Sequence, residues 1–259
     1  EFSRGGWWGR WALLTWLFYH TDGTGGPWDG HDYLTPSLFM MVATVFWLGC
    51  SNVARELVSD RPVYCRERRG GLSPGAYLAS VCAVQGVIAT AQTVLLVGLM
   101  WGFLPGLQEV PVPFTVSLLL LTACAGIGFG LLVSAVADTD IQAISYVPLL
   151  VLPQLMFSGY IKLFKQLEAP QETLSTLMPM RWSFEALSRL FYDTGPDTVA
   201  AINPLTTNPQ CITGGNNIEW IQCHLGFSQD GSVSLCIFAL FLMTVLTLGA
   251  TWHRLSRTR

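Results

Sequence analysis

Long apolar stretches alternate with short polar connections along most of this chain. Five windows of about 20 residues carry no Lys, Arg, Asp or Glu, namely 34–53, 76–101, 114–137, 141–161 and 233–252. A helix of about 20 residues is long enough to cross the roughly 30 Å hydrocarbon core of a bilayer. The pattern therefore predicts an all-α integral membrane protein with at least five spanning helices.

A weaker apolar stretch covers 7–19 and is interrupted by Arg10. A cleaved secretory signal would place small residues directly after its apolar core, whereas here His20 and a glycine-rich turn follow. We favour a membrane span over a cleaved signal. Residues 1–33 are therefore expected to hold a partial or degenerate first span and an outer loop, which gives six spans.

Composition also favours a lipid environment. Only 12% of the residues are charged and 51% are hydrophobic, whereas a soluble domain carries about 25% charged residues. The exception is the segment 54–75, which holds eight charges between two apolar windows. Each charge costs about 2.5 to 3.5 kcal/mol at the centre of a membrane helix on the insertion scale, so this segment is predicted to lie outside the hydrocarbon.

Basic residues predict how the chain is oriented, because they collect on the cytoplasmic side of membrane proteins. With six spans, the arginines near the N-terminus, those of 54–75 and those of the last span and tail, 232–259, fall on one side. We expect a multi-pass protein of the cell membrane with both termini in the cytoplasm. The acids beside Thr139 would join two spans on the same side, where we favour simple solvation over contact with a soluble partner.

The longest connection, 162–231, is predicted to be extracytoplasmic. Its first half has helical spacing around a break at Pro179, which predicts two short helices at the outer surface that enter the membrane and return. Its second half contains Cys211 and Cys223, and we favour a disulfide between them over two free thiols, because an outer face permits disulfides. The other cysteines and the scattered histidines form no paired metal-binding motif, so no metal site is predicted.

The apolar windows hold no ionisable residue that could serve catalysis. The chain also lacks HExxH, GxSxG and the phosphate-binding GxxxxGK[ST]. Pro148 and Pro153 could open an ion site in a carrier, but we favour a kink, since neighbouring groups can satisfy the backbone that proline frees. We predict no catalytic residue and no cofactor bound by this chain.

Three motifs resemble the membrane domains of ABC transporter permeases of the ABCG (White) type. The first joins GCSNVARE at 49–56 to DRPVYCRER at 60–68 and LSPGAY at 72–77. It is similar to the family's E-R-x-V-[FY]-x-R-E signature, with Asp60 in place of the first Glu. FSGY at 157–160 and LMPMRWSFEAL at 177–187 follow in the family's order. The resemblance runs from about residue 34 to the C-terminus and is closer to bacterial members than to eukaryotic ones.

The resemblance implies the membrane domain of a six-span type-2 ABC exporter. In such proteins an ATP-binding domain, fused or separate, drives two permease copies, here expected to form a homodimer. That partner domain would bind ATP and Mg, and no nucleic acid is implied. Two alternatives stay open: a non-transporting membrane scaffold or assembly subunit of the same fold, and an ion-coupled carrier.

A short helix is expected within the charged segment, because Asp60 is a good N-cap residue and Pro62 suits a first helical turn. Residues 66–69 are expected to face the cytoplasm. The resemblance identifies this helix as the coupling helix, which sits in a groove of the ATPase. Its expected contact residues are Asp60, Arg61, Arg66, Glu67 and Arg68. Without the resemblance, we would favour anchoring to anionic lipid headgroups.

The resemblance places the transport route at the dimer axis, between the second and fifth spans. The expected cavity residues are Val45, Leu48, Leu152 and Leu155, and the expected upper gate is Tyr160 with Ile161. Packing against a neighbouring helix or lipid is a nearly equal alternative for each. An apolar lining suits hydrophobic or amphipathic, lipid-like cargo, because a polar solute would lose hydrogen bonds there.

The family's outer re-entrant helix corresponds to Pro179, Arg181, Trp182 and Glu185. Arg181 and Glu185 are four residues apart and can pair on one helix face. We favour a role in holding this helix in place over the alternative, a wet notch that eases release of cargo.

Overall fold

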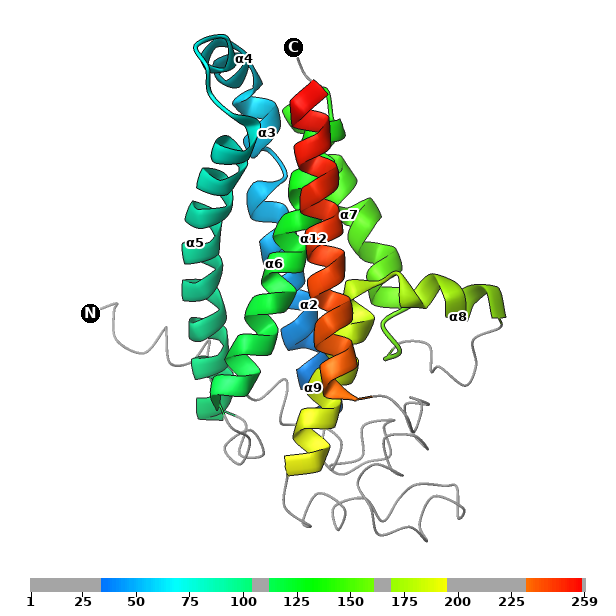
Figure 1. Cartoon of the computed structure of the whole chain (residues 1–259). Helices are drawn as coiled ribbons and strands as arrows, with labels where there is room; N and C mark the ends of the chain where they lie inside the picture. The colour runs from blue at the N-terminus through cyan, green and yellow to red at the C-terminus, as the bar shows by residue number, and fades with distance from the viewer. Residues whose placement is uncertain (1–33, 104–111, 161–168, 195–231, 258–259) are drawn as a thin grey trace, which may run out of the picture.

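The computed structural model describes residues 34–103, 112–160, 169–194 and 232–257, and within these ranges the regular structure is entirely helical. Figure 1 shows long helices standing side by side, with the short helix α4 and the C-terminus at one end of the bundle. We call this end the α4 end. The helices are α2 (Leu34–Val53), α3 (Glu56–Ser59), α4 (Arg61–Arg69), α5 (Pro74–Phe103), α6 (Val112–Val136), α7 (Asp140–Met156), α8 (Ala169–Thr176), α9 (Pro179–Thr194) and α12 (Val233–Arg257).

Four of these segments are long and apolar enough to cross a membrane, and they begin in α2, α5, α6 and α12. They confirm four of the five predicted windows. The fifth window is shorter than predicted, because α7 ends at Met156 and not at residue 161. There the chain turns through Gly159, whose φ of 91° favours glycine. The predicted first span lies outside the described residues.

Helix α6 lies at the centre of the bundle and packs most extensively on α2 and α12. The contact with α2 is close because small residues face each other. A Cβ added at Gly126 would lie 2.6 Å from the carbonyl oxygen of Phe46, and one added at Gly49 would lie 2.6 Å from that of Ala123. In membranes, small residues at an interface let helix backbones approach closely. Glycine therefore permits the spacing between α2 and α6.

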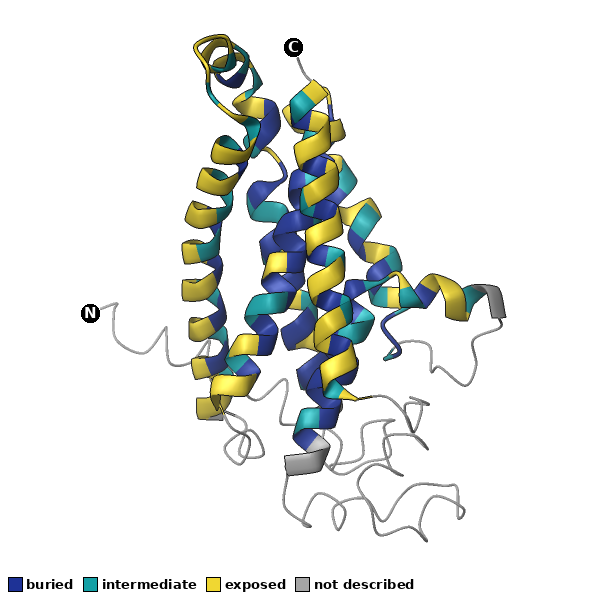
Figure 2. Cartoon of the chain, in the orientation of Figure 1, coloured by how far each residue is buried: buried dark blue, intermediate teal, exposed yellow. Residues whose placement is uncertain are grey.

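Burial separates the central helices from the peripheral ones. Figure 2 shows α5 and α12 exposed along much of their length, while the helices between them are mostly buried. Large apolar side chains are exposed on both, including Val87 at 72% and Phe238 at 66%. Apolar exposure on helices of membrane length is the expected pattern for faces that contact lipid.

The predicted pair of short helices after the fifth window is present as α8 and α9, with the break before Pro179 where it was expected. Helix α9 packs on α12, α2 and α6, whereas α8 projects to the side of the bundle (Figure 1). The intervening turn is closed by main-chain hydrogen bonds from Leu177 to Leu174 and from Met178 to Ser175.

Candidate functional site

Two arginines of α4 donate hydrogen bonds to carbonyl groups at the carboxyl ends of two long helices. Arg61 Nη2 donates to the carbonyl oxygen of Ala137, just after α6, at 2.8 Å. Arg68 donates through both terminal nitrogens, to the carbonyl oxygens of Leu255 and Ser256 in the last turn of α12, each at 2.5 Å. The last carbonyls of a helix have no partner within it and carry partial negative charge. These guanidinium groups supply both the hydrogen bonds and the opposite charge.

Tyr64 lies between these two arginines and adds a third attachment. Its side chain is 2% exposed, and its hydroxyl donates to the carbonyl oxygen of Leu255 at 3.2 Å. The ring lies 4.8 Å from that of Tyr77 at the start of α5, centroid to centroid. Helix α4 is therefore attached to α6, α12 and α5 through one face.

The opposite face of α4 is exposed. Val63 is 45% exposed, and Arg66, Glu67 and Arg69 are also exposed. Arg68 differs from these neighbours, because it is only partly exposed and turns toward α12. That residues 66–69 face the cytoplasm stays a prediction. The predicted coupling residues fall into two sets, because Arg61 and Arg68 bind the bundle while Arg66 and Glu67 point away from it.

Asp60 occupies the predicted N-cap position of α4, and Pro62 lies in the first turn, as expected. The prediction that the Asp60 side chain caps the helix is wrong, because it makes no cap hydrogen bond. It accepts instead from the Tyr77 hydroxyl at 3.4 Å. The Asp60 backbone already has helical φ and ψ, so α3 runs almost directly into α4.

Three polar contacts, which we call the polar ladder, tie α5 to α2 and α3. Besides the Tyr77–Asp60 contact, Gln85 donates to Glu56 at 2.8 Å. Asn52 donates to Gln92 at 3.1 Å. The ladder runs antiparallel along the two segments and holds a helix that otherwise buries little of its surface. It was not predicted, although polar residues at regular spacing in the 76–101 window were a signal for it.

The turn from α4 to α5 is fixed by two helix-end motifs. At the end of α4, the amide of Leu72 donates to Glu67 and that of Gly71 to Arg68, and Gly71 has a φ of 103°. This is the Schellman arrangement, in which glycine tolerates the left-handed backbone. Ser73 then accepts from the amide of Ala76 at 3.2 Å and caps α5, so the reversal uses few residues.

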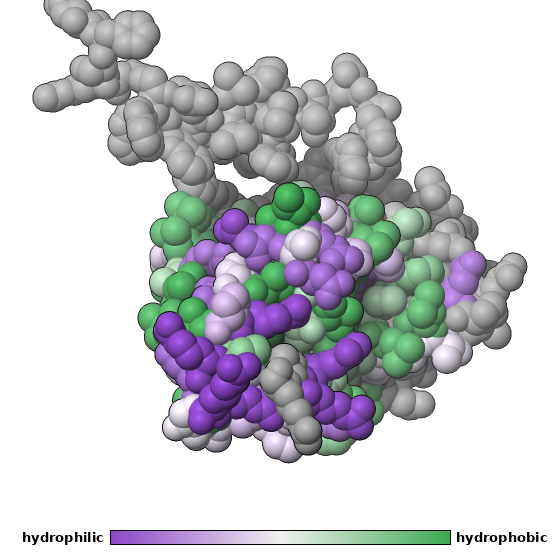
Figure 3. Space-filling view, turned by 90° about the horizontal axis from the view of Figure 1, so that it is seen from above, coloured by the Kyte–Doolittle hydropathy of each residue, from purple (hydrophilic) through white to green (hydrophobic). Residues whose placement is uncertain are grey.

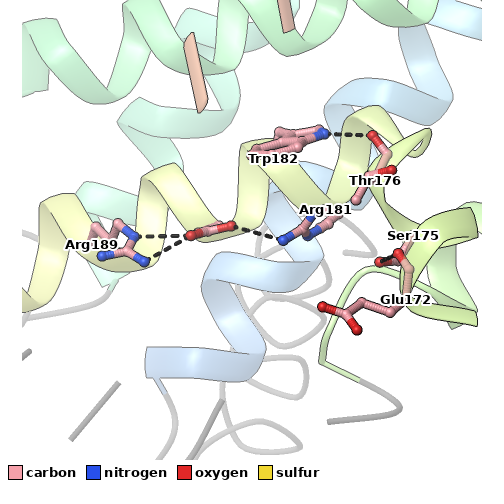
Figure 4. A network of polar contacts seen from close by, with 7 residues as sticks. Glu172, Ser175, Thr176, Arg181, Trp182 and Arg189 are labelled. Atoms are coloured by element: carbon pink, nitrogen blue, oxygen red, sulfur yellow. Dashed lines mark hydrogen bonds and ion pairs between the residues drawn. The ribbon is translucent and has the colours of Figure 1, made fainter. Parts of the chain in front are cut away.

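A buried ion-pair cluster lies on α9. Glu185 is 3% exposed and accepts from Nε and Nη2 of Arg189 at 3.1 and 2.8 Å. Arg181 approaches the other carboxylate oxygen at 3.7 Å, which confirms the expected pair. Figure 4 shows Arg181 and Arg189 on either side of this carboxylate. Burial lowers the pKa of Arg181, and Glu185 opposes that shift. Arg189, the closer partner, was missed, although it is also four residues from Glu185.

Further contacts fix α9 against its neighbours. Trp182 Nε1 donates to the carbonyl oxygen of Thr176 at 2.8 Å, and the Arg181 guanidinium lies 4.3 Å from the Trp182 ring centroid. Thr122 of α6 donates to Ser183 at 2.8 Å. These contacts are compatible with a role in holding the helix in place.

The four predicted cavity residues differ in their burial. Val45 is buried, and it lines a narrow gap with Leu48 and with residues of α5 and α6. Leu152 is 58% exposed on α7, and Leu155 is partly buried against the core. A common lining for these four residues thus stays a prediction that involves a second copy.

Tyr160, the described part of the predicted gate, is held in an aromatic cluster. Its ring stacks on Phe39 of α2 at 4.5 Å and lies 6.0 Å from Phe184 of α9, centroid to centroid. Ile161 and the predicted Cys211–Cys223 disulfide lie outside the described residues. Among the described residues, no group of three or more His, Cys, Asp or Glu side chains could hold a metal ion.

Comparison with known proteins points to one family. The family model described as ABC-2 type transporter matches residues 10–192, well over half of the chain. The ABC transporter ATP-binding/permease protein Rv1747 of Mycobacterium tuberculosis is 28% identical over 155 residues, which cover 58% of this chain and 18% of that protein. The chain therefore spans less than a fifth of that relative's length. The matched range of the family includes α4 and most of α9.

Proposed function

Since this chain belongs to the ABC-2 type transporter family, we propose that it works as the permease half of an ATP-driven exporter that moves hydrophobic or amphipathic cargo outward. Its membership makes it a multi-pass membrane protein and the permease domain of an ABC transporter. Direction, cargo, oligomeric state and the finer assignment to the ABCG type belong to the proposal. So do the cell-membrane location and the cytoplasmic placement of both termini.

The observation that carries the proposal is the two-sided structure of α4. One face binds the ends of α6 and α12 through Arg61, Tyr64 and Arg68. The other presents an apolar residue, Val63, beside exposed charges. A short helix attached to several spans, with a free charged face, is suited to receive a displacement and pass it to those spans.

We propose that this free face docks on an ATP-binding domain, which binds ATP and Mg. ABC-2 permeases normally work with such a domain, and the Mycobacterium tuberculosis relative is named as an ATP-binding/permease protein. Arg66 and Glu67 would make charge-assisted hydrogen bonds across the interface, which are about twice as strong as neutral ones. Val63 would supply an apolar contact with the ATP-binding domain. Whether the ATP-binding domain is fused or separate does not alter this role.

A second copy of the chain would complete the transport route. Helix α7 exposes an apolar stripe that includes Ile141, Leu149 and Leu152, and we propose that this stripe faces the partner across a dimer axis. The predicted cavity and gate residues would then act at that axis. An apolar route favours lipid-like cargo, since polar solutes would lose hydrogen bonds on entering it.

The test is to reconstitute the chain with its ATP-binding domain in vesicles and measure cargo-stimulated ATP hydrolysis together with efflux of a lipid-like dye. Replacing both Arg66 and Glu67 by Ala should abolish the link between hydrolysis and efflux while the protein remains folded. Arg257 is an exposed arginine at the same end of the bundle. The matched control Arg257→Ala should keep ATP hydrolysis linked to efflux. Efflux that does not require ATP would instead favour an ion-coupled carrier. A complete lack of efflux would favour a non-transporting scaffold.

A further inference from the structure

A shallow notch opens at the α4 end, between α4 and the adjoining ends of α5, α6 and α12. Ala135 of α6 lines it together with Leu57, Arg61, Tyr64, Tyr77, Arg254 and Leu255. We call it the arginine notch. Its side chains come from segments far apart in the sequence, and Arg61 and Arg254 are its charged members. Figure 3 looks down on this end and shows hydrophilic side chains gathered beside hydrophobic ones across one part of the face.

Trp252 indicates where the notch lies relative to the membrane. This side chain is 49% exposed, and its indole nitrogen would lie 3.8 Å from a Cβ added at Gly75. Tryptophan is enriched at the boundary between hydrocarbon and headgroups. Arg254 follows two residues later, about 3 Å farther along the helix axis. The notch therefore lies at the level of lipid headgroups, just beyond the apolar parts of α5 and α12.

The polar groups in the notch favour an anion. Both tyrosine hydroxyls already donate, that of Tyr64 to the Leu255 carbonyl and that of Tyr77 to Asp60, so the donors left for an anion come from the arginines. Arg61 gives one N–H to Ala137, and a guanidinium carries five N–H donors. Cationic donors on an apolar floor of Leu57 and Leu255 match a phosphate joined to an apolar tail.

We propose that the arginine notch binds the phosphate of an anionic phospholipid headgroup. Arginine is suited to this role because its planar fork of donors matches phosphate oxygens. Basic pockets between membrane helices are a known way to hold such headgroups. The bound lipid lies against the same helix ends that α4 joins, so it strengthens the attachment of α4 to α12. This site does not depend on transport or on ATP.

The test uses the full chain in nanodiscs of equal parts phosphatidylglycerol and phosphatidylcholine, followed by extraction into detergent and native mass spectrometry of the retained lipids. Phosphatidylglycerol should be retained in preference. Arg61→Gln and Arg254→Gln should each lower that preference about fivefold, the effect of one arginine near an anionic surface. Arg66→Gln and Arg69→Gln, on the exposed face of α4, should change it by less than about twofold, because solvent screens exposed charges.

Three results would overturn the proposal. Equal retention of phosphatidylcholine would show that negative headgroup charge is not selected. Equal losses in the two pairs of variants would indicate a diffuse surface attraction. Displacement of the lipid by excess inorganic phosphate would show that a free anion occupies the notch. If Arg61→Gln fails to fold because Ala137 loses its donor, Arg254→Gln decides alone, and an unchanged preference in that variant rejects the site.

Discussion

Arg68 on the short helix α4 closes the carboxyl end of the last helix by donating to the carbonyl oxygen of Leu255, 187 residues farther along the chain. From its charges alone, the segment that contains Arg68 would be taken for a solvated loop. The hydrogen bond instead attaches this segment to the end of a membrane helix. It fixes the rotation of α4 about its own axis, so that Arg68 points toward the bundle and Arg66 points away from it.

Replacing Arg68 by Gln should destabilise the protein by about 1–3 kcal/mol, because two partly buried charge-assisted hydrogen bonds to the end of α12 are lost. Thermal unfolding in detergent would measure the change. Arg66→Gln is the matched control on the same helix and should shift stability by no more than about 0.5 kcal/mol. Equal effects in the two variants would mean that Arg68 does not support α12.

Gly126→Ala should destabilise the bundle by about 1–3 kcal/mol, the usual range for overpacking a core. The added methyl would lie 2.6 Å from the Phe46 carbonyl oxygen, which is backbone and cannot move aside alone. Gly98→Ala on α5 meets nothing within 4 Å and should be neutral or gain up to about 1 kcal/mol from helix propensity. Denaturant unfolding of the two variants tests the difference, and a stable Gly126→Ala would contradict the close contact.

Glu185→Ala should cost about 3–5 kcal/mol, because it leaves Arg189 of α9 buried without its carboxylate. Replacing Glu185 and Arg189 together by Met should recover part of this loss, since Arg189 no longer leaves an unpaired buried charge, while Arg181 still lacks its carboxylate. Arg181→Met should have a smaller effect, because Arg181 lies farther from the carboxylate. Thermal unfolding of all three variants provides the comparison, and a double variant no better than Glu185→Ala would refute the pairing.

Gln85→Leu should loosen α5 with little change in global stability, since polar contacts between membrane helices average about 0.6 kcal/mol. The expected signature is faster amide hydrogen exchange in α3 and the first half of α5. Val84→Leu, an exposed neighbour of similar size, is the control. Unchanged exchange in Gln85→Leu would show that the Glu56 contact does not hold α5.

Gly71→Ala should cost about 1 kcal/mol, because alanine is strained at the positive φ that ends α4. Gly70→Ala, one residue earlier and at a negative φ, should cost less. The measured difference in unfolding free energy reports on the Schellman turn itself. A reversed order of the two variants would contradict its geometry.

The sequence predicts the long helices well and the contacts between them poorly. Four windows become helices of membrane length because apolar composition alone fixes their environment. Helix α4 was also predictable, from Pro62 and the cluster of charges. The inward turn of Arg68 was not, because it depends on where the end of α12 lies in space. The contact between Arg189 and Glu185, in contrast, could have been predicted, because these residues have the same four-residue spacing as Arg181 and Glu185.

The short end of α7 shows another limit. Apolar composition continues to residue 161, but the helix stops where the chain turns at Ser158 and Gly159. Ser158 Oγ donates to the carbonyl oxygen of Leu155 at 2.7 Å, which satisfies one of the last helix carbonyls. Hydrophobicity reports the environment of a residue, and local backbone geometry decides whether the helix continues.

The glycines of α6 also determine which parts of the molecule can shift. Gly126 and Gly130 fit against the backbone of α2, and Gly128 fits against the Thr247 side chain of α12. Sliding or rotation of α2 on α6 would force backbone atoms into one another, and movement of α12 would force Thr247 into the backbone of α6. We expect the trio to behave as one stiff frame. Any rearrangement of the bundle then falls to α5, which the polar ladder holds, and to α7, where Asp140 accepts from the Ser59 hydroxyl and Gln154 from the Met180 amide. Such contacts can break and re-form.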